Sequence, residues 1–184
     1  KRNYSWVDLD NDNAIEVIIN YLIKKNHTHI AYINISEKYN FANERKSSFL
    51  KNLKLNKINF NPKYYASVKL EEPENSFEVI KKMLTKNKKI SSIICSTEFS
   101  ALSAIKACNY LNYKIGKDIS IITFDGALVR DLSSPPITAV SFPVKELGKR
   151  AINILLNKNK NKNRTINYLA KSEIIERGSV HIVS

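Results

Sequence analysis

The chain has 184 residues, which is enough for one sizeable domain or for a domain of two lobes. Hydrophobic residues make up 43% of it, yet no apolar run approaches the roughly 20 residues that a membrane-spanning helix needs. Two cysteines, Cys95 and Cys108, are too few for a disulfide framework or a zinc site, so we expect a cytoplasmic protein without a membrane partner. The first residues lack an initiator Met and a signal peptide, and we expect the chain to begin within a longer protein.

The formal net charge of +13 allows two interpretations. A basic surface is typical of proteins that bind nucleic acid. An AT-rich coding sequence would also produce it, because such a bias raises Lys, Asn and Ile together. We favour the second interpretation, since the lysines are spread along the whole chain. Only residues 157–164 form a dense basic run, and we expect that run to be a solvated loop.

Short strand-like runs of apolar residues alternate with longer runs at helical spacing. The predicted elements, in chain order, are a strand at 6–9, a helix at 11–25, a strand at 28–35, a helix at 43–53, a strand at 64–68, a helix at 74–85, a strand at 90–95, a helix at 98–111, strands at 119–124 and 137–142, and a helix at 145–156. Asn11 or Asp12 could cap the first helix, and Asn26 could close it.

The tail segments 166–170 and 173–176 are predicted to pair with each other as strands. Several of the earlier strands are apolar on both faces and alternate with helices. This pattern predicts an α/β fold with a doubly wound parallel sheet that helices cover on both faces.

In such a sheet, ligands bind beyond the carboxyl ends of the strands. The residues that follow the predicted strands and carry useful chemistry are Tyr39, Phe41, Arg45, Thr97, Glu98 and Asp125. Charged groups that can bond hydroxyls, beside flat aromatic faces, are typical of a site for a sugar or another polyol.

Each of these residues also has a purely structural interpretation. Thr97 could cap the helix that follows it, with Glu98 in the first turn stabilised by the helix dipole. Asp125 could shape a turn with Gly126, and Arg45 could be a solvated residue of its helix. The residues alone leave these alternatives open.

No catalytic motif is present in the sequence. There is no G-x-S-x-G, no H-E-x-x-H and no Gly-rich phosphate loop, for which four glycines leave little room. Glu98 and Asp125 could imitate an acid pair, but nothing supplies a nucleophile beside them. His27 and His29 lack a third ligand and are expected to be surface or capping residues. We therefore predict a protein that is not an enzyme and that holds no cofactor or metal.

Several short motifs occur in a fixed order along nearly the whole chain. They are residues 22–31 (LIKKNHTHIA), 94–104 (ICSTEFSALSA), 118–125 (DISIITFD), 134–140 (SPPITAV) and 175–179 (IERGS). Each motif is weak alone, but the ordered set is specific. Together they resemble the regulatory domain of lac-repressor-family transcription regulators, which is periplasmic-binding-protein-like.

The resemblance implies a ligand-sensing domain of a DNA-binding regulator, expected to be a repressor. Members carry a helix-turn-helix headpiece and two lobes around an effector cleft. Effectors are commonly sugars, and purines or nucleosides in some branches. In many members the residues matching Arg45 and Asp125 hold the effector, the position matching Thr97 often touches it, and the loop matching Tyr39 and Phe41 can contribute. Effector binding shifts the lobes and so changes operator affinity.

The expected partners are therefore a small-molecule effector, operator DNA through a headpiece outside this chain, and a second copy in a homodimer. The sequence departs from the family where Thr97-Glu98 replaces Asn-Asp. The alternative is a sugar-binding protein of a transport system, which shares the fold; the P-P-I-T-A-V segment favours the regulator.

The resemblance also implies that this chain is mainly the C-terminal lobe of a two-lobed domain. We expect residues 1–10 to end the N-terminal lobe, residues 11–133 and 164–184 to form the C-terminal lobe, and residues 134–163 to return to the N-terminal lobe. Without the rest of that lobe, the returning segment would expose Val140, Phe142, Leu147, Ile152 and Leu155. Such a patch favours association, so we expect the chain to dimerise or to exchange this segment.

Overall fold

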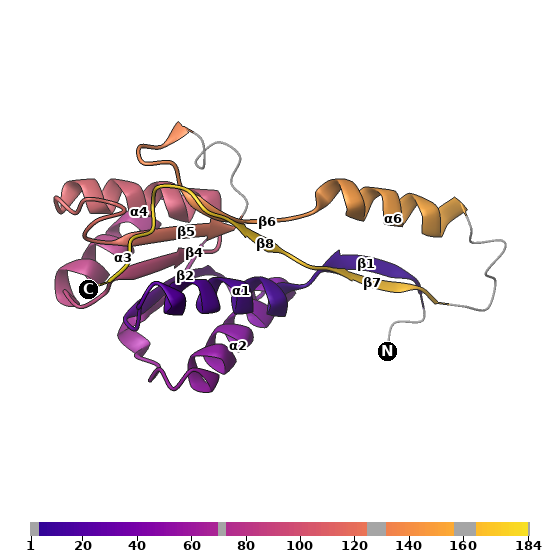
Figure 1. Ribbon diagram of the computed structural model, residues 1–184, viewed down its shortest axis with the longest axis horizontal. Helices are drawn as coiled ribbons and strands as arrows, with labels where there is room; N and C mark the ends of the chain where they lie inside the picture. The colour runs from indigo at the N-terminus through magenta and orange to yellow at the C-terminus, as the bar shows by residue number, and fades with distance from the viewer. Residues whose placement is uncertain (1–3, 70–72, 125–131, 157–164, 184) are drawn as a thin grey trace.

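The computed structural model describes residues 4–69, 73–124, 132–156 and 165–183, and it contains a six-stranded and a two-stranded sheet (Figure 1). The strands are β1 (Trp6–Leu9), β2 (Ile30–Ile35), β3 (Tyr65–Val68), β4 (Ser92–Cys95), β5 (Ser120–Phe124), β6 (Thr138–Ser141), β7 (Asn167–Ala170) and β8 (Glu173–Ile175). The α-helices are α1 (Asn11–Lys24), α2 (Asn40–Leu55), α3 (Pro73–Lys86), α4 (Glu98–Tyr110) and α6 (Val144–Leu156), with a 3-10 turn at Pro62–Tyr64.

The six-stranded sheet has the order β3-β2-β4-β5-β6-β8, and every neighbouring pair is parallel except β6 and β8. Helices α1 and α2 pack together on one face, and α3 and α4 pack together on the other (Figure 1). The predicted doubly wound α/β fold is therefore confirmed. This arrangement places the carboxyl ends of β2, β4 and β5 along one edge of the sheet.

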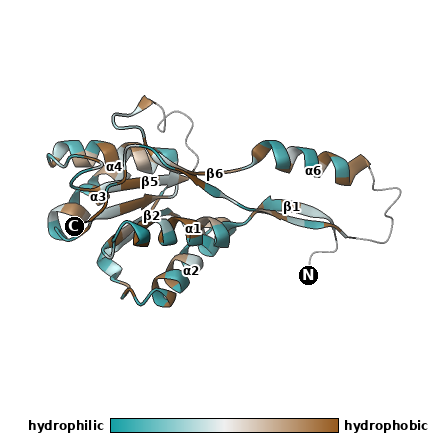
Figure 2. Ribbon diagram, in the orientation of Figure 1, coloured by the Kyte–Doolittle hydropathy of each residue, from teal (hydrophilic) through white to brown (hydrophobic). Residues whose placement is uncertain are grey.

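The sheet separates two apolar clusters because side chains alternate along a strand. Within β4, Ile93 packs towards α3 and α4 whereas Ile94 packs towards α1 and α2, and Ile121 and Ile122 repeat this alternation in β5. All four side chains are buried. Figure 2 shows the central strands as hydrophobic and the helices as mixed, which is the pattern of strands buried on both faces.

The sequence predicted the residue that closes α1 at its carboxyl end but not the residue that caps its amino end. Asp10 caps the helix, since its carboxylate accepts a hydrogen bond of 2.9 Å from the backbone N–H of Asn13. The expected caps, Asn11 and Asp12, are wrong because both residues already lie within the first helical turn. At the other end, Asn26 has φ of 64°, so the predicted left-handed closure is confirmed.

The two tail strands do not pair with each other, so that prediction is wrong. β7 pairs in parallel with β1, and β8 pairs antiparallel with β6. Only Lys171 and Ser172 separate β7 from β8, and the chain continues through them without reversing direction (Figure 1). A hairpin requires a reversal, so the two strands belong to different sheets.

The expected excursion at 134–163 begins later than predicted, because β6 lies inside the large sheet between β5 and β8. Val140 is fully buried there and Phe142 packs against the core, so their expected exposure is wrong. In α6 the expected exposure is confirmed for Ile152 and Leu155, whereas Leu147 is partly buried. Helix α6 has no buried residue, packs against β1, and leaves Ile152 57% and Leu155 70% exposed.

His27 is buried rather than on the surface, which corrects its predicted role. Its Nδ1 lies 2.8 Å from the Ser91 hydroxyl, and its Nε2 lies 3.0 Å from the Ser120 hydroxyl and 3.1 Å from the carbonyl oxygen of His181. The rings of His27 and His181 meet edge to face at 5.1 Å. This cluster ties the end of the chain to the amino end of the sheet. Burial lowers the pKa of His27 to about 4.

Stability should fall in acid because of this histidine. An unfolded His27 takes up a proton near pH 6.5, whereas the folded one does so only near pH 4. Its contribution is thus fully present above pH 6.5 and is lost between pH 6.5 and 4, with a limiting slope of about 1.4 kcal/mol per pH unit. Urea unfolding at a series of pH values should show this slope. His27→Gln should flatten it and His29→Gln, at an exposed position, should not; equal slopes in all three proteins would contradict the assignment.

Gly116 is a second position where the fold depends on one residue. Its φ is 78°, and a Cβ there would lie 2.3 Å from the carbonyl oxygen of Gly178. Gly116→Ala should therefore cost about 2 kcal/mol or more in the free energy of unfolding. Gly148→Ala is the matched control, because a Cβ at Gly148 in α6 meets nothing within 4 Å. It should be neutral or stabilising by up to about 1 kcal/mol, and a similar loss in both variants would contradict the prediction.

Candidate ligand-binding site

Arg45 lies in the second turn of α2 and is 5% exposed. Its Nε donates a hydrogen bond of 2.8 Å to the side-chain oxygen of Asn11, and one terminal nitrogen donates to the backbone carbonyl of Ser96 at 3.3 Å. Asn11 in turn donates to a carboxylate oxygen of Glu44 at 2.8 Å. The structure therefore excludes the interpretation of Arg45 as a solvated helix residue.

Three aromatic rings surround the guanidinium of Arg45. Its Cζ lies 3.9 Å from the ring centre of Phe124, 5.0 Å from that of Phe41 and 5.6 Å from that of Phe142. A cation over the face of an aromatic ring is attracted by the ring quadrupole, and more strongly where water is excluded. Burial lowers the pKa of Arg45 to about 10, so the group remains cationic at neutral pH.

Topology explains why these groups meet. Phe124 ends β5, Ser96 directly follows β4, and Phe142 directly follows β6. Arg45 arrives from the helix after β2. Since neighbouring parallel strands end at the same edge of the sheet, side chains distant in the sequence gather there. Asn11 joins them from the start of α1.

Tyr39 and Phe41 extend this aromatic wall. Their rings stack at 5.9 Å with an interplanar angle of 27°, and Phe41 is 37% exposed. Tyr39 stands at the cap position of α2, where its backbone is extended. The structure thus brings Tyr39, Phe41 and Arg45 together as one group at the edge of the sheet.

Thr97 and Glu98 follow β4 directly after Ser96, the residue whose carbonyl accepts from Arg45. Thr97 caps α4, because its hydroxyl accepts from the backbone N–H of Ser100 at 3.2 Å and the Ser100 hydroxyl accepts from the backbone N–H of Thr97 at 3.1 Å. Glu98 lies in the first turn of α4 and is partly buried. The structural interpretation of both residues is confirmed, and contact with a ligand remains a prediction. Asp125 lies outside the described residues.

A buried network of polar side chains lies next to Ser96, whose carbonyl oxygen accepts from Arg45. The side-chain oxygen of Asn34 accepts from the hydroxyls of Tyr32 at 3.3 Å and Ser96 at 2.8 Å, and its amide donates to the Tyr65 hydroxyl at 3.1 Å. Tyr65 donates to Glu37 at 3.0 Å. Satisfied buried networks of this kind hold side chains in one arrangement. This network connects the carboxyl ends of β2 and β4 to Tyr65, the first residue of β3.

Sequence reasoning missed three residues that hold the site. Asn11 fixes Arg45, Asn34 organises the network, and Phe124 forms the nearest wall of the guanidinium. A usable signal existed for Asn34, a polar residue within the otherwise apolar run of β2. None existed for the pairing of Asn11 with Arg45, which are 34 positions apart.

An α/β domain with polar and aromatic side chains gathered at the carboxyl edge of its sheet has the architecture of domains that commonly bind small molecules there. The family model of the periplasmic binding protein-like domain matches residues 19–180. The chain therefore belongs to this family, in the form that lac-repressor-family transcription regulators carry. None of the described helices is long and apolar enough to cross a membrane.

Two curated relatives are regulators. The chain is 30% identical over 154 residues to the HTH-type transcriptional repressor PurR of Histophilus somni (strain 2336), covering 82% of this chain and 46% of that protein. It is 29% identical over 177 residues to the HTH-type transcriptional regulator RegA of Clostridium saccharobutylicum, covering 94% of this chain and 52% of that protein. The chain thus spans about half the length of these relatives.

Solved structures of similar fold include two complexes. A sugar-binding transcriptional regulator of the lac-repressor family from Escherichia coli, complexed with phosphate, matches with a TM-score of 0.84 at 23% identity, over 96% of this chain and 63% of that one. The transcriptional regulator CelR in complex with cellobiose matches with a TM-score of 0.85 at 16% identity, over 96% of this chain and 54% of that one. At these identities the likeness concerns the fold alone.

Replacement of Asn11 should destabilise the protein through Arg45. Asn11→Ala removes the acceptor of a buried cationic N–H, and we expect a loss of about 2 kcal/mol in the free energy of unfolding. Asn20→Ala, at an exposed position of the same helix, should change little. Urea denaturation of the two variants beside the parent checks this. If Asn11→Ala were as harmless as Asn20→Ala, the hydrogen bond would not hold Arg45.

Proposed function

We propose that the chain is the ligand-sensing domain of a DNA-binding transcription regulator, acting as a repressor. A small effector binds at the carboxyl edge of the large sheet and alters the affinity of the whole protein for its operator. The observation that carries this proposal is the buried guanidinium of Arg45 behind a wall of Phe124, Phe41 and Phe142. The family relationship to regulators, rather than to enzymes, supports it.

The effector that this site fits best is a sugar. An arginine supplies N–H donors for hydroxyl oxygens, and flat rings pack against the C–H face of a sugar ring. Phe41 is partly exposed beside the buried cation, and Tyr39 stacks on it, so a flat surface borders the polar group. The solved CelR–cellobiose complex is consistent with this class. A purine or nucleoside, which would stack on the same rings, is the second candidate.

We assign effector contact to Arg45, Phe41 and Tyr39, and further contacts to Thr97, Glu98 and Asp125. The first three lie together in the structure, and Thr97 and Glu98 follow the Ser96 carbonyl that Arg45 contacts. Thr97 can contribute while it caps α4, since its hydroxyl has a second lone pair. Asp125 lies outside the described residues, and its role rests on the family match.

Coupling to DNA would follow from a difference in effector affinity between two arrangements of the protein. The elements β1, β7 and α6 lie beyond the end of the large sheet, joined to it by extended chain segments (Figure 1). The exposed apolar side chains of α6, including Ile152 and Leu155, fit a helix that packs against further parts of the full-length protein. We further propose that the full-length protein is a cytoplasmic homodimer.

The test is a thermal-shift screen of the full-length protein against sugars, purines and nucleosides. A ligand present at 100 times its Kd should stabilise the folded state by about 2.7 kcal/mol. The hit should lose most of this shift in Phe41→Ala and in Arg45→Lys, and retain it in Leu55→Ala, a 68% exposed position at the far end of α2. The same ligand should change operator affinity in a DNA-binding assay.

Two results would contradict the proposal. A hit with the same shift in Phe41→Ala and Arg45→Lys would bind elsewhere. A hit that depends on both residues but leaves operator affinity unchanged would favour a solute-binding role over regulation.

A further inference from the structure

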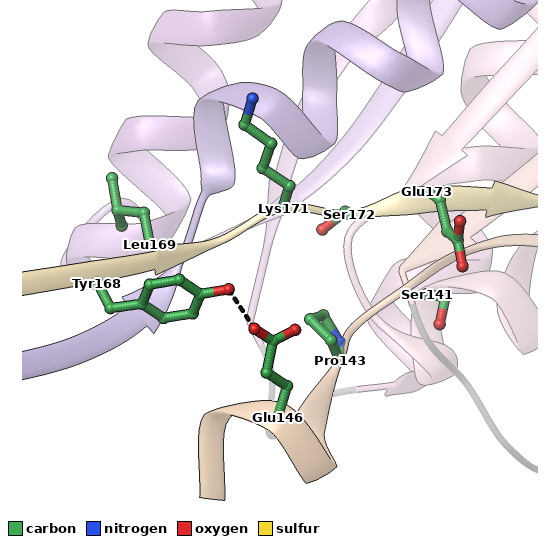
Figure 3. A pocket seen from close by; sticks show the side chains of 8 residues that line it. All are labelled: Ser141, Pro143, Glu146, Tyr168, Leu169, Lys171, Ser172 and Glu173. Atoms are coloured by element: carbon green, nitrogen blue, oxygen red, sulfur yellow. Dashed lines mark hydrogen bonds between the residues drawn. The ribbon is translucent and has the colours of Figure 1, made fainter. Parts of the chain in front are cut away.

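We call β1, β7 and α6 the outlying elements, because they lie beyond the end of the large sheet. A groove of about 480 Å³ lies where the chain passes between the large sheet and these outlying elements (Figure 3). One side comes from the segment that links β6 to α6 and the other from the segment that links β7 to β8. The polar residues that line it are Ser141, Glu146, Tyr168, Lys171, Ser172 and Glu173. Its walls therefore belong to both parts of the molecule.

This groove is separate from the site at Arg45. Phe142 lies 5.6 Å from the Arg45 guanidinium and 6.1 Å from the ring of Phe124, so it faces the first site. Its neighbours Ser141 and Pro143 line the groove instead. Alternate side chains of an extended segment point to opposite sides, so the groove lies behind this segment as seen from Arg45.

The hydroxyl of Ser172 is the feature of the groove that points to a polar ligand. The residue is only 8% exposed, and its hydroxyl has no hydrogen-bond partner among the described residues. Its backbone N–H donates to the side-chain oxygen of Asn13 at 3.0 Å, which fixes its position. Figure 3 shows the hydroxyl directed towards the groove. Buried hydroxyls are nearly always hydrogen-bonded, so an unpartnered one indicates a missing polar partner.

The chemistry of the lining defines the class of that partner. The Tyr168 hydroxyl donates to Glu146 at 2.6 Å, and Arg150 lies 3.5 Å from the same carboxylate. Two carboxylates, Glu146 and Glu173, outnumber the single lysine of the lining, which disfavours an anion. A neutral polyol satisfies all of these groups, because each of its hydroxyls donates to a carboxylate and accepts from a serine or a lysine.

We propose that the groove is a second small-molecule site, which binds a neutral polyhydroxylated compound through Ser172, Glu146 and Glu173. Ser141 and Glu173 belong to strands of the large sheet, whereas Tyr168 and Glu146 belong to the outlying β7 and α6. A compound bound across them contacts both parts at once. It therefore favours one relative arrangement of the two parts and modulates whatever response the first site controls.

The experiment uses the full-length protein with selectively labelled leucine methyl groups. Sorbitol and D-glucose, a linear and a cyclic polyol, are titrated separately while the methyl signals of Leu169, which lines the groove, and Leu55, which does not, are followed by NMR. The methyl signals of Leu169 should shift to a plateau as at least one probe reaches millimolar concentrations, and those of Leu55 should not shift.

Two serine variants provide matched tests. Ser172→Ala should weaken the binding seen at Leu169 about tenfold, as expected for the loss of one hydrogen bond, without lowering stability. Ser92→Ala removes the other buried serine hydroxyl that lacks a partner among the described residues, and it lies in β4 away from the groove. This control should bind as the parent does.

The proposal is overturned if neither probe shifts the methyl signals of Leu169 to a plateau. It is also overturned if the Ser172→Ala variant binds both probes as tightly as the parent protein does. A crystal structure that shows only water on the Ser172 hydroxyl at saturating probe would also overturn it. Repeating the titration in Phe41→Ala separates the two sites. A Leu169 response that survives in this variant belongs to the groove, whether or not the proposed effector role of Arg45 is correct.

Discussion

Burial of both faces of one parallel sheet is the constraint on which the rest of this structure depends. Backbone groups in β2, β4, β5 and β6 are satisfied by their neighbours in the sheet, and the side chains above and below enter two separate apolar clusters. Helices must then cover both faces, and each crossover returns the chain to the same end of the sheet. The loops that carry polar residues are thereby collected along one edge.

The site at that edge is held by polar contacts that the apolar core makes possible. Arg45 is nearly excluded from water, and hydrogen bonds to Asn11 and Ser96 together with the ring of Phe124 offset part of the cost of burying its charge. The network around Asn34 fixes the strand ends beneath it. Under the proposed function, a cation held in this way binds oxygen atoms of the effector with little rearrangement.

The outlying elements differ in kind from the large sheet. β1 and β7 form a sheet of only two strands, and α6 buries none of its side chains. Such a group is not expected to be stable by itself. Its position next to the large sheet depends on the two segments that link it to β6 and β8, where the groove at Ser172 lies. A relative movement of the two parts would change this junction.

Several elements could be predicted from local information. The runs of Ile30–Ile35 and Ser120–Phe124 are apolar on both faces, and α1 shows helical spacing of Ile15, Ile18 and Leu22. These patterns are properties of neighbouring residues, so they predict a doubly wound α/β fold. They also led to Arg45, Phe41 and Tyr39, because position after a strand is likewise a local property.

The pairing of distant segments was decided only in the tertiary structure. Nothing near β8 indicates that it pairs with β6 rather than with β7, and nothing near Asn11 indicates that it bonds to Arg45. The burial of His27 against His181 and the unpartnered hydroxyl of Ser172 likewise depend on segments that are distant in the sequence. Amino-acid sequence by itself determined the periodicity and the residues at the strand ends. Which of those residues meet was determined by packing, because contact depends on the positions of elements that lie far apart along the chain.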